Sequence, residues 1–127
     1  MSKQEALYDV HQEHAEWISK LNFYKDDIKI FNTRLEEIVS KNNGVEVLAE
    51  VEKFQNQFII QRNNIDEIAH IITLDEVEIQ NEVKANPVAV DHRKVGDQSE
   101  HRDLVATFEK NFTELRAEYN KFSAKWM

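Results

Sequence analysis

Apolar residues recur every three or four positions along almost the whole chain, in three long segments. In the first segment the steps of three and four alternate through Leu7, Val10, His14, Trp17, Leu21, Tyr24, Ile28, Phe31, Leu35 and Ile38. This heptad spacing is typical of helices that pack lengthwise in a left-handed coiled coil. Similar stripes run from Leu48 to Ile72 and from His101 to Trp126. Each stripe needs a helical partner, because a helix alone in water gains too little from intrinsic propensity to stay folded.

Two breaks separate the three segments. Asn42, Asn43 and Gly44 tolerate the backbone conformation that closes a helix, and Pro87 cannot donate a backbone hydrogen bond. Three possible capping boxes mark the helix starts: Ser2 with Glu5, Asn43 with Glu46, and Asp97 with Glu100. The pattern therefore predicts helices near 3–41, 45–85 and 98–126, with 86–97 as the one real loop.

The short hinge between the first two segments predicts that they pack antiparallel, and the third segment then returns along the first. The chain has 127 residues, which is the usual size of one domain, so we expect residues 1–127 to form a single unit. Two glycines and one proline are too few for the many turns of a β-sandwich or an α/β fold. The sequence thus predicts an all-α, up-down-up three-helix bundle with coiled-coil packing.

The third helix is expected to be shorter than the other two by roughly ten residues, which corresponds to about 15–20 Å. If it begins level with the end of the second helix, Trp126 lies near Gln57 and Phe58, and two helices alone form the tip beside Asn43. Apolar surface left open there would indicate a contact site. The alternative is that the tip residues cover each other or that the third helix docks in a shifted register. The expected interface residues are Phe31, Leu35, Ile38, Val47, Leu48 and Val51. We therefore expect an interaction or scaffold module that forms a homodimer or binds another helical protein.

The charge of the chain narrows the range of partners. The formal net charge is −8, and the densest basic group, Arg93 and Lys94 beside His92, is small. Nucleic-acid binders and proteins that bind anionic membranes depend on basic surfaces, so neither class is expected. The chain has no cysteine, which excludes disulfides and thiolate zinc sites. No apolar run has the length of a signal-peptide core or a membrane span, and a cytoplasmic location is the expected default.

The histidines suggest an alternative function. In an antiparallel bundle all five lie in the half far from Asn43, together with several acids. The candidate metal ligands are His11, His14, His70, Asp75 and His101. Imidazole and carboxylate together suit zinc, iron or manganese. The competing interpretation is that His14 and His101, which lie on the apolar stripes, are hydrogen-bonded core residues and that the other histidines are solvated.

Catalytic motifs are not evident. The few serines lie in no strained elbow, and no glycine-rich phosphate loop is present, so the sequence does not indicate an enzyme. The chain resembles the spectrin repeat in its three long helices, its heptad stripe and the Trp17 of its first helix. That resemblance implies a shape and carries no function.

Overall fold

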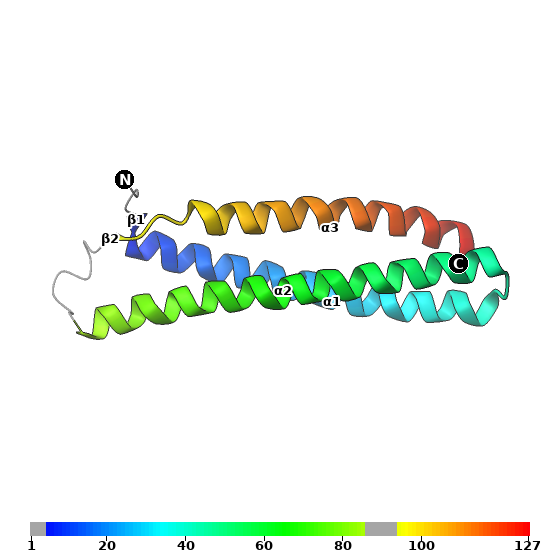
Figure 1. Ribbon diagram of the computed structural model, residues 1–127, viewed down its shortest axis with the longest axis horizontal. Coiled ribbons are helices and arrows are strands. Elements are labelled where there is room, and N and C mark those ends of the chain that lie inside the picture. Colours follow the sequence, from blue (N-terminus) through cyan, green and yellow to red (C-terminus); the bar gives the residue numbers. More distant parts are fainter. Residues whose placement is uncertain (1–4, 86–93) are drawn as a thin grey trace.

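The computed structural model describes residues 5–85 and 94–127 and shows three long helices that lie side by side (Figure 1). Their bounds are α1 Leu7–Lys41, α2 Val45–Ala85 and α3 Ser99–Trp126, and two short strands are β1 Glu5–Ala6 and β2 Lys94–Val95. The chain runs along the long axis in α1, returns in α2 and runs outward again in α3 (Figure 1). The predicted all-α, three-helix fold is confirmed, and α2 has the predicted bounds.

The first helix begins later than predicted, at Leu7 instead of near residue 3. Glu5 and Ala6 instead pair antiparallel with Val95 and Lys94, so part of the predicted loop forms a strand. The expected capping role of Glu5 is wrong, because its carboxylate accepts a hydrogen bond from the backbone N–H of Gln98. Ser2, and the 86–93 part of the predicted loop, lie outside the described residues.

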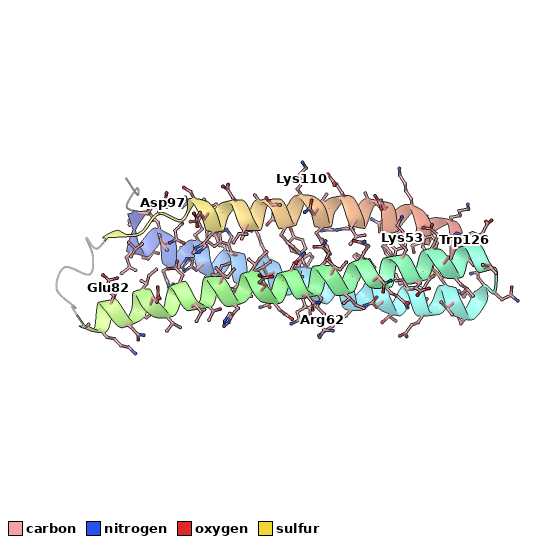
Figure 2. All side chains as sticks on the ribbon, in the orientation of Figure 1. Lys53, Arg62, Glu82, Asp97, Lys110 and Trp126 are labelled. Atoms are coloured by element: carbon pink, nitrogen blue, oxygen red, sulfur yellow. The ribbon has the colours of Figure 1, made fainter. Side chains whose placement is uncertain are left out.

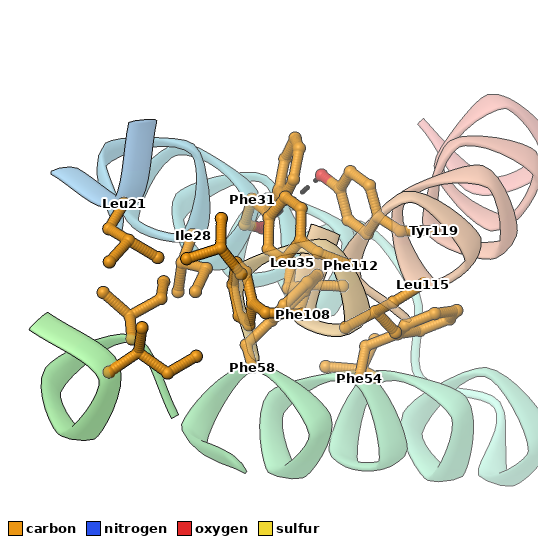
Figure 3. Packing of buried hydrophobic residues seen from close by; sticks show 14 of the residues in the cluster. Leu21, Ile28, Phe31, Leu35, Phe54, Phe58, Phe108, Phe112, Leu115 and Tyr119 are labelled. Carbon is orange, nitrogen blue, oxygen red and sulfur yellow. Dashed lines mark hydrogen bonds between the residues drawn. The ribbon is translucent and has the colours of Figure 1, made fainter. Parts of the chain in front are cut away.

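The core is rich in aromatic rings in the half of the bundle near Asn43. Rings from all three helices meet there, and Figure 3 shows Phe31, Phe54, Phe58 and Tyr119 converging. The rings of Phe31 and Tyr119 have centroids 4.4 Å apart, and the Tyr119 hydroxyl donates to the Phe31 carbonyl oxygen at 3.5 Å. Large rigid rings bury much apolar area and fit in few arrangements, so they favour one alignment of α3 on the hairpin.

That alignment places the end of α3 at the hinge, contrary to expectation. Asn42 Nδ2 donates to the carbonyl oxygen of Trp126 at 3.4 Å, and the Phe122 and Phe54 rings lie 5.2 Å apart. Figure 2 shows Trp126 beside the start of α2. The prediction that Trp126 lies near Gln57 and Phe58 is therefore wrong. The extra length of α2 extends past the start of α3 at the opposite end (Figure 1).

The premise of the expected tip interface is therefore wrong. Five of its six residues are buried within this chain itself: Phe31, Leu35, Ile38, Val47 and Val51. Leu48 is 37% exposed and is the one that could reach a partner without repacking of the bundle. The physical reason is that α3 covers the apolar surface that two helices alone would have left open.

The outer faces of the helices are largely polar. Of the helices in the described part of the chain, none combines the length and apolar character that crossing a membrane requires.

Loss of the Phe58 ring tests the aromatic core. Phe58 is fully buried against Phe31 and Tyr119, so Phe58→Ala should lower the free energy of unfolding by about 3–5 kcal/mol, because it leaves a cavity. Phe23→Ala removes the same group from a residue that is 60% exposed and should cost about 0.5 kcal/mol or less. Urea unfolding followed by circular dichroism measures both; equal losses would contradict the packing described.

Candidate metal centre

Three potential metal ligands from three different helices meet at the end of the bundle far from Asn43. They are His14 of α1, Asp75 of α2 and His101 of α3. One nitrogen or oxygen atom from each lies within 4.8 Å of the other two. The heptad spacing directs His14 into the bundle, where it is only 2% exposed, and the alignment of α3 brings His101 alongside. Segments 61 and 26 residues apart in the chain thus contribute to one compact group of donor atoms.

The Oδ2 atom of Asp75 lies close to both histidines. It is 3.3 Å from His14 Nε2 and 3.6 Å from His101 Nδ1. This oxygen is buried and accepts no hydrogen bond within the described part of the chain. A buried carboxylate oxygen without such a partner is costly, so a cation at this place would stabilise it.

Glu76 determines which nitrogen of His14 carries a proton. Burial raises the pKa of Glu76, but hydrogen bonds from His11, His14 and Gln80 outweigh it and hold the pKa below its ordinary value. The carboxylate is therefore ionised near neutral pH and can only accept hydrogen bonds. Since His14 Nδ1 lies 2.9 Å from Glu76 Oε2, Nδ1 must carry the proton. The other nitrogen of His14, Nε2, then faces Asp75 and α3.

Gln98 places a further oxygen beside that nitrogen. Its side-chain NH₂ group donates to the carbonyl oxygen of Gly96 at 3.2 Å, so its Oε1 atom points to the histidines. Oε1 is 2.8 Å from His14 Nε2 and 3.0 Å from His101 Nδ1. Both ring nitrogens of His14 thus face acceptors, and a neutral imidazole can donate from only one of them. A metal ion at Nε2 would satisfy this nitrogen while Nδ1 donates to Glu76.

An ion-pair network fixes the start of α3, and with it Gln98 and His101. Arg102 donates to Glu13 Oε2 at 2.8 Å, and it also donates to the Glu5 carboxylate. Hydrogen bonds from Arg102 and from the backbone N–H of Gln98 lower the pKa of Glu5, and the two glutamates raise the pKa of Arg102. Glu5 therefore joins β1 to the first turn of α3, next to the candidate metal ligands.

The structure brings together three of the five predicted metal ligands. His11 bonds to Glu76 but points largely into solvent, and His70 is exposed on α2 outside the group. His92 lies outside the described residues. Sequence reasoning omitted Glu76 and Gln98 from the site. The position of Glu76 next to Asp75 was a usable signal, whereas Gln98 precedes α3 and has no feature that distinguishes it in the sequence.

Comparison with models of known protein families, with curated proteins and with solved structures gives no significant match for this chain.

Replacement of Arg102 tests the ion-pair network. The folded pKa of Glu5 is below its unfolded value, so Glu5 contributes stability above about pH 4.5 that is lost as the pH falls through the folded pKa. Arg102→Gln should lower stability near pH 7 and make the loss on acidification shallower. Arg62→Gln, at an exposed position of α2, should change neither the stability near pH 7 nor its loss on acidification. Urea midpoints measured between about pH 7 and pH 3 report both effects, and parallel acid curves would contradict this role.

Proposed function

We propose that this chain is a metal-binding helical bundle, with Zn²⁺ as the preferred ion. The ligands are His14 Nε2, His101 Nδ1 and Asp75 Oδ2, with Gln98 Oε1 next to the same position. The observation that carries the proposal is the buried His14 ring. Its Nδ1 is hydrogen-bonded to Glu76. Its Nε2 faces two oxygen atoms, Asp75 Oδ2 and Gln98 Oε1.

The spacing of the ligand atoms fits a small cation. Bonds of about 2.0–2.1 Å in a tetrahedral site place neighbouring ligand atoms about 3.4 Å apart. The Asp75 oxygen lies 3.3 and 3.6 Å from the two histidine nitrogens, so these edges already have that length. Gln98 Oε1 is closer to the histidines and would move outward by about half an ångström on metal binding.

Glu76 supports the same interpretation. Metal-bound histidines usually donate their other ring N–H to a carboxylate, which fixes the ring and makes the ligating nitrogen more basic. The contact from His14 Nδ1 to Glu76 has this arrangement, at 2.9 Å. The hydrogen bond between His14 Nε2 and Gln98 leaves Asp75 Oδ2 without a hydrogen bond of its own among the described residues, whereas a cation would contact this oxygen and both imidazoles.

Two imidazoles with one carboxylate favour zinc over manganese, which prefers mostly oxygen ligands, and leave iron as the second ion to test. A bound ion would join α1, α2 and α3 at the end where the smaller apolar cluster of Val10, Ile79 and Val95 lies. Its role would then be structural, and it is compatible with a scaffold that has no catalytic activity.

Metal titration of protein purified without an affinity tag tests the proposal. One equivalent of Zn²⁺ should bind and raise the melting temperature, and EDTA should reverse this, because an ion that binds only the folded state stabilises it. His101→Ala and Asp75→Asn should lower the affinity at least tenfold. His70→Ala removes an exposed histidine of α2 that is not a proposed ligand, and it should leave the zinc affinity unchanged. Unchanged melting temperature with zinc, iron and manganese would refute the proposal.

Glu76→Gln examines the orienting contact. The amide is close in shape but uncharged, so the variant should keep one binding site and lose about 10–100-fold in zinc affinity, the usual effect of removing such a partner. Competition with a zinc indicator measures the change. Affinity equal to that of the unchanged protein would show that Glu76 does not orient His14 for the metal.

A further inference from the structure

A groove of about 560 Å³ lies between α2 and α3, in the same half of the bundle as the candidate metal centre. Its apolar floor includes Ile68 and Phe108, which are buried, and Ile71 and Leu104, which are partly or largely open. Leu104 is 40% exposed although it belongs to the apolar stripe of its helix. The groove therefore has an apolar floor that a partner could cover.

The groove follows the two helices along their length. It extends from Gln61 to Ile71 on α2 and from Glu100 to Asn111 on α3. At 1.5 Å per residue, the walls are about 15–17 Å long, which corresponds to about three turns of a docked helix. An open channel between two parallel walls suits an amphipathic helix, which places residues spaced three and four apart along the floor.

The charge of the walls is uniformly negative. Glu67 contributes from α2, and Glu100 and Asp103 contribute from α3. Among the described residues that line the groove, none is a lysine or an arginine. Opposite charges along the rim would steer a basic segment into the groove, and like charges would disfavour an acidic one. A second copy of this chain, with its formal charge of −8, is therefore the less suitable occupant.

We propose that this groove binds an amphipathic helix of about three turns from another protein, with two or three aliphatic residues on one face and lysine or arginine beside them. Such a helix would cover Leu104 and Ile71 with its apolar face. Its cationic side chains would lie against Glu67, Glu100 and Asp103. The inference stands apart from metal binding, because it depends on none of the proposed ligands.

The test uses the full chain and a fluorescein-labelled, alanine-based peptide of about 14 residues, with three leucines on one helical face and flanking lysines. Fluorescence anisotropy should show saturable one-to-one binding that weakens as salt is added. A peptide of the same composition with its leucines scattered around the helix should bind at least tenfold more weakly. A peptide with glutamate in place of lysine should also bind at least tenfold more weakly.

Protein variants locate the binding surface. Glu67→Lys reverses an exposed charge on the rim and should weaken binding of the lysine peptide about tenfold, whereas Glu36→Lys makes the same change on an exposed part of α1 and should have little effect. Leu104→Asp should weaken binding at least as much. Circular dichroism and thermal melting confirm that each variant is folded, and the solvent-exposed Glu67 keeps the test valid if Leu104→Asp fails to fold.

Amide chemical shifts show where on the protein the peptide binds. Changes on peptide binding should concentrate in 61–71 and 100–111. Failure of the lysine peptide to bind, equal binding of the scattered or glutamate peptides, or shifts concentrated elsewhere would overturn the proposal. Self-association of the chain through Leu104, detected by light scattering and abolished by Leu104→Asp, would also overturn it. Peptide binding is measured both with EDTA and with zinc. Binding that is equal in the two conditions does not depend on the metal, so the two proposals can fail independently.

Discussion

The position of α3 along the α1–α2 hairpin is the constraint on which the rest of the structure depends. This helix has 28 residues and lies beside one of 41, so it can cover only part of the hairpin. The aromatic contacts among Phe31, Phe54, Tyr119 and Phe122 place its end at the hinge. Large rings interlock in few ways, and a shift of one turn would separate these pairs and leave cavities.

That single alignment also determines what lies at the other end. With Trp126 beside Asn42, the first turn of α3 meets α2 at Asp75 instead of at Ala85. His101 therefore lies next to His14 and Asp75. The salt bridges from Arg102 to Glu5 and Glu13 hold the same turn to the beginning of the chain. Aromatic packing in one half of the bundle thus brings polar donor atoms together in the other.

The two halves differ in how they are held. Near the hinge, contacts among buried rings fill the space between the helices. At the far end, a smaller apolar cluster of Val10, Ile79 and Val95 lies beside the hydrogen bonds of Arg102, and the groove between α2 and α3 leaves part of the apolar stripe of each helix uncovered. Buried polar groups are costly when they lack a hydrogen bond, and at this end Asp75 Oδ2 accepts none within the described part of the chain, while Leu104 is 40% exposed.

The local pattern of the sequence was sufficient to predict the three helices. The apolar spacing and the break at Asn42–Gly44 are properties of neighbouring residues, and for that reason the bounds of α2 and the burial of His14 could be predicted. The same pattern suits several alignments of α3, because a heptad stripe repeats and can slip by whole turns. The premise of the tip interface, that α3 stops short of the hinge, was wrong for this reason, and Gln98 and Glu76 were missed. Only the packed structure decided which rings interlock, and therefore which side chains from distant segments meet.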